Sequence, residues 1–86
     1  MRPQQVRCAD IRSDPRSSGY TPLAVEALAD DIRAHGVLRP LLLRTTTHGY
    51  VIVHGERRWQ AARMAGLDAV PAFLVHEFAP LESVAT

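Results

Sequence analysis

A short glycine-bounded segment, His54–Gly66, constrains the fold of this 86-residue chain more than any other feature. Its sequence, HGERRWQAARMAG, predicts a strand that ends at Gly55 and a helix over residues 56–65. Arg57 and Arg58 fall in the first helical turn, where the helix dipole is positive and cations are disfavoured. The backbone N–H groups of such a turn bind anions. A glycine followed by two arginines at this place therefore predicts a bound anion, and phosphate fits best.

The predicted helix has two faces. At about 100° per residue, its apolar arc is broad and rich in alanine, and it comprises Trp59, Ala61, Ala62 and Ala65. The opposite, polar arc comprises Glu56, Gln60 and Arg63. The small alanines predict a close approach of this helix to a sheet, and Trp59 is expected in the core. Arg58 lies within the apolar arc, so we expect it to reach past the helix end to a ligand rather than stay buried without a partner.

The length of the chain and its net charge limit the classes of protein to which it can belong. A chain of 86 residues forms one small domain, and its net charge of +1 excludes a protein that is basic throughout. The charge is unevenly distributed, because residues 33–63 contain six arginines and one acid, which gives +5. The single cysteine, Cys8, forms no internal disulfide and is expected to be a buried small hydrophobe. No apolar run reaches membrane-spanning length, so we expect a cytoplasmic protein without membrane contact.

The remaining elements follow from periodicity and turn residues. Thr21 and Pro22 predict the start of an amphipathic helix that runs to His35 and stops at Gly36. Two apolar runs around a glycine-containing turn predict a β-hairpin over residues 41–53. We expect two further strands, at residues 6–11 and 72–77, with a loose lead-in before the first. The hairpin is apolar enough for a sheet that is covered on both faces, or on one face with self-association on the other.

Three segments of the chain, Gly36–Leu43, Gly55–Ala62 and Gly66–Pro71, together resemble the N-terminal domain of ParB-like chromosome- and plasmid-partition proteins. The specific part is the run G-E-R-R-x-x-A-A followed by A-G-L-x-x-V-P. The similarity covers roughly residues 6–77, which are expected to form a ParB-like nucleotide-binding domain. Residues 78–86 are expected to be a tail or the truncated start of a further element.

The resemblance implies a fold, ligands and partners. The implied fold is α+β, a small mixed sheet packed with short helices, and it is shared with sulfiredoxins. The implied ligands are CTP and Mg²⁺, and the implied partners are a second copy of the chain, as a homodimer, and DNA. By position, the family's nucleotide-pocket loop falls on Gly36, Arg39 and Pro40, and its triphosphate-binding residues fall on Gly55, Glu56, Arg57 and Arg58. Glu56 has three possible roles, as a stabiliser of the helix dipole, as a Mg²⁺ ligand and as a carboxylate that orients an arginine, and no other metal ligand is expected.

Three departures from the family pattern matter. Gln60 stands where another arginine is frequent, and Arg39 stands where glutamine is common. The sequence ends at Thr86, whereas full-length partition proteins continue into a helix-turn-helix DNA reader and a dimerisation segment. The chain is therefore expected to be a fragment or a free-standing domain. Sulfiredoxins use a cysteine in the glycine-led turn, and because Glu56 occupies that turn here, sulfiredoxin chemistry is not expected.

Four functions follow from these observations. The favoured one is a CTP-binding, DNA-associated module that self-associates in chromosome or plasmid partition, in the nucleoid of the cytoplasm. A stand-alone nuclease or NTP hydrolase is an alternative, although the sequence offers no convincing nucleophile or carboxylate pair for it. Whether the chain hydrolyses CTP weakly is left open. A third is a non-specific DNA-backbone binder that uses the +5 segment. The fourth is a protein-interaction scaffold without a ligand.

Overall fold

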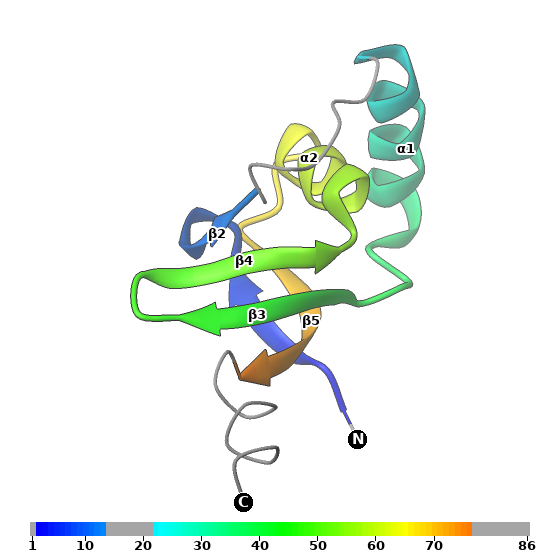
Figure 1. The fold of residues 1–86 in the computed structure, drawn as a ribbon. Coiled ribbons are helices and arrows are strands. Elements are labelled where there is room, and N and C mark those ends of the chain that lie inside the picture. The colour runs from blue at the N-terminus through cyan, green and yellow to red at the C-terminus, as the bar shows by residue number, and fades with distance from the viewer. Residues whose placement is uncertain (1, 14–21, 77–86) are drawn as a thin grey trace, which may run out of the picture.

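The computed structural model describes residues 2–13 and 22–76 (Figure 1). In these residues the chain forms β1 (Gln4–Arg7), the 3₁₀ helix η1 (Cys8–Asp10), β2 (Ile11–Arg12), α1 (Pro22–His35), β3 (Leu41–Thr46), β4 (Gly49–His54), α2 (Glu56–Met64) and β5 (Ala69–His76). The predicted helix cap at Thr21 and the predicted tail at 78–86 lie outside the described residues. None of the described helices is long and apolar enough to cross a membrane.

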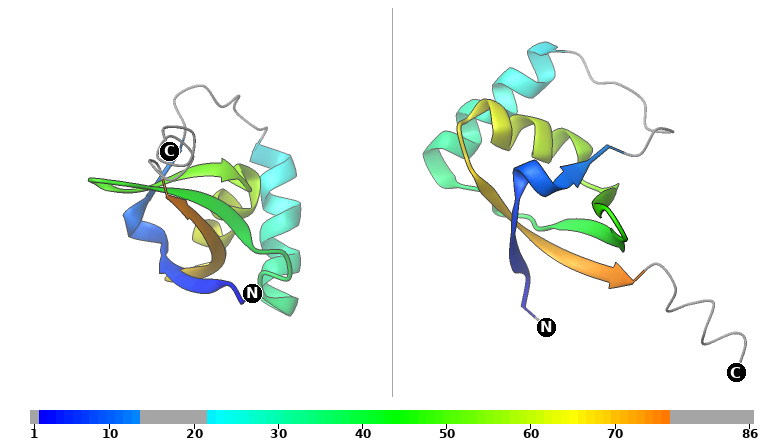
Figure 2. Two further views of the ribbon diagram at one scale, coloured as in Figure 1. Left: turned by 60° about the horizontal axis from the view of Figure 1, so that its bottom comes forward. Right: turned by 90° about the vertical axis from the view of Figure 1, so that its left-hand side faces the viewer.

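The five strands form one mixed sheet in the order β1-β5-β3-β4-β2. β3 runs antiparallel to β4 and parallel to β5, while the edge strand β2 runs parallel to β4. Consecutive strands β1 and β2 therefore lie at opposite edges, although only η1 joins them. The four peptide units from Arg7 to Ile11 span at most about 14 Å, whereas five flat strands would separate the edges by about 19 Å. The sheet must therefore curl until its two edges approach, as Figure 2 shows.

This arrangement corrects one prediction and confirms others. The single strand predicted at residues 6–11 is wrong, because η1 breaks it into two strands, and the lead-in residues Gln4 and Gln5 belong to β1. Both helices and the β3–β4 hairpin are confirmed. β5 begins before the predicted strand and includes Pro71. At Pro71 the strand has only β1 beside it, since pairing with β3 begins at Ala72, so the missing N–H does not interrupt the β3 ladder.

The buried side chains form two clusters that meet at α2. One lies inside the curled sheet and comprises Val6, Cys8, Ile11, Leu41, Leu43, Ile52, Trp59, Ala62, Val70 and Ala72. The other lies between the helices and comprises Val25, Ala29, Ile32 and Ala61. Trp59 is in the core, as predicted, and its Nε1–H donates to the Cys8 carbonyl at 3.3 Å. The two buried alanines of α2 belong to different clusters. Ala62 packs against the sheet, whereas Ala61 packs against α1.

The sheet has one covered and one open face. Helix α2 covers the inner face, and α1 packs on α2 (Figures 1 and 2). On the outer face Val53 and Val75 are exposed, while Leu42 and Phe73 are half-buried. In the described residues one face of the sheet is covered and one apolar face is partly open, and self-association through that open face stays a prediction.

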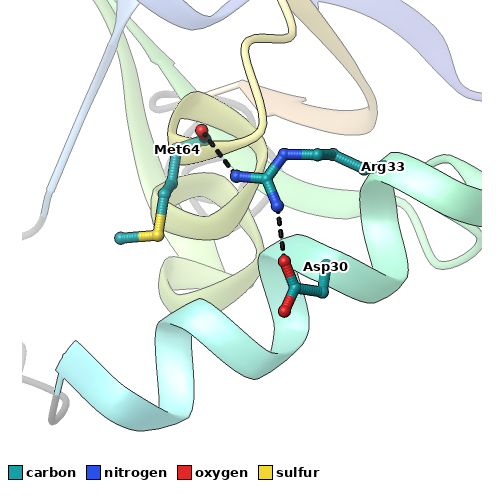
Figure 3. A network of polar contacts seen from close by, with 3 residues as sticks. All are labelled: Asp30, Arg33 and Met64. Atoms are coloured by element: carbon teal, nitrogen blue, oxygen red, sulfur yellow. Dashed lines mark hydrogen bonds and ion pairs between the residues drawn. The ribbon is translucent and has the colours of Figure 1, made fainter.

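Arg33 near the end of α1 joins the two helices (Figure 3). Its Nη1 donates to Asp30 Oδ1 at 2.5 Å, one turn earlier on α1. Its Nη2 donates to the Met64 carbonyl at 3.4 Å, at the C-terminal end of α2. The guanidinium thus places a cation where the α2 dipole is negative and an unpaired carbonyl needs a donor.

We expect the substitution Arg33→Met to lower the free energy of unfolding by about 0.5–1 kcal/mol, because it keeps the aliphatic stem but removes both hydrogen bonds. Urea unfolding followed by circular dichroism measures this loss. Asp30→Asn is the control, since it removes only the exposed ion pair and should cost less. Equal losses in the two variants would contradict a contribution from the Met64 carbonyl.

Candidate functional site

The start of α2 forms the centre of the site. Gly55 is the N-cap residue, with φ of 109°, and it offers no side-chain acceptor to the helix amides. The first helical hydrogen bond runs from the Trp59 N–H to the Gly55 carbonyl at 2.9 Å. The amides before Trp59 have no carbonyl within the helix to bond, which is the feature that makes a helix start attractive to anions. This is the geometry that the sequence predicted for the glycine-led turn.

A cavity of about 560 Å³ lies against this turn. It is bounded by the last turns of α1, the loop that follows α1, and the first turn of α2. Six of the seven predicted site residues line it, namely Gly36, Arg39, Gly55, Glu56, Arg57 and Arg58. The structure thus brings together two segments that are about twenty residues apart in sequence. Pro40 does not line the cavity, although its carbonyl accepts a hydrogen bond from Arg58, which does.

Arg57 and Arg58 play different parts in this geometry. Arg57 is exposed at the second position of α2. Arg58 is half-buried, and its Nη1 donates to two backbone carbonyls, those of Arg39 at 3.2 Å and Pro40 at 2.7 Å. A guanidinium carries five N–H donors, so the remaining groups of Arg58 are not used by these two bonds. In the described residues Arg58 thus bonds the backbone carbonyls of Arg39 and Pro40, and its expected contact with a ligand stays a prediction.

Glu56 is buried, which the sequence did not predict. We expected it on the solvent-facing arc of α2, yet only 7% of its surface is exposed. Its Oε2 accepts a hydrogen bond from Ser13 Oγ at 2.6 Å and another from Gln60 Nε2 at 2.9 Å. Ser13 directly follows β2, so the chain leaving that edge strand covers the carboxylate. Oε1 is buried without a hydrogen-bond partner in the described residues.

The cavity has further lining residues that were not named from the sequence, although Val37 and Leu38 lie within the loop expected to line it. α1 contributes Leu28, Asp31 and Ile32, the loop contributes Val37 and Leu38, and β4 contributes His54. Leu38 is 77% exposed and Asp31 contacts the His35 ring nitrogen at 3.2 Å. Leu38 carried a usable signal, since a leucine in a short loop beside a predicted ligand site is poorly placed for a core. The part played by α1 depends on helix packing and has no local signature.

Cys8 does not line this cavity. It belongs to the 3₁₀ helix η1, and a second hollow beside it is lined by residues that include Arg63 and Asp68. Burial raises the pKa of the Cys8 thiol, against a smaller opposing effect of Arg63. The described residues contain no group of three or more His, Cys, Asp or Glu side chains that could hold a metal ion. Cys8 is therefore a buried thiol of the core, as predicted.

We expect Cys8 to react much more slowly with a thiol-specific disulfide reagent at pH 8 in native protein than in urea, because the thiolate is the reactive form and burial disfavours it. The raised pKa has a second consequence. The native state holds the thiol proton more tightly, so this contribution to stability is present at neutral pH and is lost as the pH rises above about 8.5. The absorbance change of the thiol reagent measures the reaction rate in each state. Equal rates in native and denatured protein would contradict the burial of Cys8.

Comparison with known proteins identifies the family. The profile of the ParB N-terminal domain matches residues 2–85. Stage 0 sporulation protein J of Bacillus subtilis is 38% identical over 90 residues, covering 94% of this chain and 32% of the relative. ParB of Caulobacter crescentus, C-terminally truncated and complexed with CTP-gamma-S, superposes with a TM-score of 0.79 at 33% identity, over 93% of this chain and 48% of that structure. The same protein complexed to the centromeric parS site gives 0.78 at 33% identity, over 94% and 45%.

The fold is also that of sulfiredoxin. The Arabidopsis thaliana protein superposes with a TM-score of 0.71 at 22% identity, over 95% of this chain and 98% of that structure, which shows a common fold. The predicted α+β fold class is confirmed by these neighbours. This chain spans about a third of the length of the Bacillus relative. The family profile covers nearly every residue, and the chain is therefore a member of the ParB N-terminal domain family.

Proposed function

We propose that this chain is a nucleotide-binding module of the partition type, and that its ligand is CTP. The observation that carries the proposal is the convergence of the Gly55-led helix start and the loop after α1 on one cavity of about 560 Å³. Three arginines, Arg39, Arg57 and Arg58, line that cavity, as expected for a ligand with several negative charges. The Caulobacter relative, whose structure contains CTP-gamma-S, supports the choice of nucleotide.

In this proposal the triphosphate occupies the start of α2 and the nucleoside rests against the loop after α1. The amides of the first helical turn and the Arg57 guanidinium bind phosphate oxygens. The loop residues Leu38 and Arg39 form the facing wall, and their backbone groups meet the base and ribose. A cavity of this volume suits a ligand larger than inorganic phosphate.

A magnesium ion fits the proposal through Glu56. A carboxylate oxygen is a preferred Mg²⁺ ligand, and Oε1 of Glu56 is buried without a partner in the described residues. Mg²⁺ binds through one or two carboxylates together with substrate phosphates, so a single protein carboxylate at this place is sufficient. The ion would neutralise part of the triphosphate charge beside the buried Glu56.

Isothermal titration calorimetry with each of the four ribonucleoside triphosphates and Mg²⁺ tests the proposal. We expect saturable binding of CTP, with weaker binding of the others, and loss of affinity when Mg²⁺ is removed. The variant Arg63→Ala controls for non-specific attraction between the nucleotide and the positive charge of α2. It removes one charge outside the cavity, so its CTP affinity should equal that of the wild type. Absence of binding heat with every nucleotide at about 1 mM would contradict the proposal, because it would leave less than about 4 kcal/mol of binding free energy for the cavity.

We further propose that the chain associates with DNA and with a second copy of itself, near the bacterial nucleoid. The +5 charge of residues 33–63 supports DNA association, and so does the parS complex of the Caulobacter relative. Sedimentation equilibrium with and without CTP tests self-association, and an unchanged monomer in both conditions would contradict it.

A further inference from the structure

The outer face of the sheet carries a row of side chains that crosses four strands. In this row Arg12 of β2 pairs with Val51 of β4, Val51 pairs with Arg44 of β3, and Arg44 pairs with Val75 of β5. Because paired residues point to the same face of a sheet, the four side chains lie on one surface, where arginine and valine alternate. Helix α2 covers the opposite face, and α1 packs on α2 (Figures 1 and 2). Neither described helix therefore covers the row.

Apolar side chains extend this row into a patch. Val75 is 42% exposed, and Val53, two residues after Val51 on β4, is 40% exposed. Leu42 and Phe73 pair with each other on β3 and β5, and both are half-buried. The apolar face of a sheet is normally packed against another layer, because the burial of apolar surface is the main favourable term in folding and association. In the described residues this patch lacks such a layer.

The charge of the outer face has one sign. None of the five described strands contains an acidic residue, whereas Arg12 and Arg44 both lie in the row. In the part of the chain that the structure describes, the half-buried Arg44 has neither a hydrogen bond nor an ion pair. The Arg12 Nη2 donates to the His48 carbonyl at 3.3 Å. Since a guanidinium has five N–H donors, both arginines retain donors for an anionic group.

We propose that this outer face is a docking surface for an acidic amphipathic helix of a partner protein. The apolar side of that helix covers the exposed valines, and carboxylates at its border pair with Arg12 and Arg44. The pair formed by the half-buried Arg44 gains strength as docking excludes water from the row. None of the residues of this face lines the cavity beside Gly55, so the surface is independent of the proposed nucleotide site.

Charge and polarity together favour this occupant over two others. A second copy that docked through the same face would bring arginines against arginines, and like charges across an interface oppose binding. A DNA backbone would match the arginines but would leave the valines and Phe73 against hydrated phosphates, so that their apolar surface would not be buried. An acidic amphipathic helix satisfies both the arginines and the apolar side chains.

Two synthetic peptides of opposite charge test the docking surface. Both form amphipathic helices with leucine on one side, and the border of that side carries glutamate in one peptide and lysine in the other. We expect the glutamate peptide to bind the full chain with a dissociation constant of about 10–100 µM, and the lysine peptide to bind at least about tenfold more weakly. Amide shifts of ¹⁵N-labelled protein measure both affinities, and the largest shifts should fall on β3, β4 and β5.

Charge reversal in the row makes the test specific. Arg44→Glu should weaken the glutamate peptide about tenfold and strengthen the lysine peptide by a similar factor. Arg12→Glu should act in the same direction and changes a more exposed side chain, so it serves if Arg44→Glu does not fold by circular dichroism. Arg63→Glu is the control, because it makes the same change on α2, away from this face, and should alter neither affinity.

Three results would overturn the proposal. One is that the wild type does not prefer the glutamate peptide, or that charge reversal in the row leaves its affinity unchanged. Another is that Val75→Asp converts a wild-type dimer into a monomer in sedimentation equilibrium, which would show that the face joins two copies of the chain. The third is displacement of the bound glutamate peptide by duplex DNA, which would assign the face to nucleic acid. Each result leaves the proposed nucleotide binding standing, because no nucleotide is present in these experiments.

Discussion

Replacing Gly55 by alanine is expected to lower the free energy of unfolding by about 2–4 kcal/mol. Two costs combine at this position. The backbone has φ of 109°, a conformation that residues with a Cβ rarely adopt, and the added Cβ would lie 2.8 Å from Leu41 Cγ. Leu41 is fully buried, so a shift of its side chain would disturb the packing of the core. Because a domain of this size has only about 5–15 kcal/mol of stability, the loss is a large fraction of the total.

Gly66→Ala is the matched control for this prediction. Gly66 also has a positive φ, of 86°, but nothing lies within 4 Å of an added Cβ. It should therefore cost only the backbone strain, about 1–2 kcal/mol. Urea unfolding of both variants separates strain from close contact, and equal losses would contradict the role assigned to the Gly55–Leu41 approach. CTP binding should fall in Gly55→Ala even where the protein stays folded, since the helix start moves.

The second large effect is expected from Ala61→Leu, which we predict to cost about 1–3 kcal/mol by overpacking. Ala61 is completely buried between α2 and α1, in contact with a cluster that includes Ala29 and Ile32. A leucine there would push the helices apart. Because α1 leads into the cavity loop at Gly36, we also expect weaker CTP binding in the same variant.

Ala34→Leu makes the same chemical change on the exposed surface of α1 and should alter neither stability nor binding measurably. Thermal unfolding and calorimetric titration of the two variants give the comparison. A full-affinity Ala61→Leu protein with reduced stability would show that the spacing of the helices does not control the cavity.

The elements that could be predicted are those with local signals. α1 carries a strong 3.6-residue periodicity with a glycine at its end, and the β3–β4 hairpin consists of two apolar runs around a glycine turn. The break between β1 and β2 had no such signal, because Cys8–Asp10 contains neither glycine nor proline. At that break the chain leaves β5 at one edge of the sheet and crosses to β4 at the other, and the Cys8 N–H still donates to the Asp68 carbonyl at 2.8 Å. A contact between residues sixty positions apart leaves no mark in the local pattern.

The candidate site also has features that could be predicted from local sequence and features that could not. The glycine-led start of α2 could be predicted, because a glycine and two arginines at a helix start are visible in the sequence. The bonds from Arg58 to the loop carbonyls could not, since they depend on how the β3 entry lies against α2. The burial of Glu56 was also hidden, because Ser13, which covers it, belongs to the far end of the chain. Six of the residues predicted from the sequence therefore line one cavity, whereas the burial and hydrogen bonds of their side chains depend on tertiary contacts.

Nuclear magnetic resonance on ¹⁵N-labelled protein tests the central claim most directly, because it reports binding and its place together. Spectra are recorded while CTP and Mg²⁺ are added, and the amide shifts are mapped on the structure. We predict that the largest shifts fall on two segments, the Gly55–Arg58 turn and the Gly36–Arg39 loop, which line the same cavity. Saturable shifts confined to the hollow beside Cys8, or no shifts at saturating nucleotide, would contradict the account.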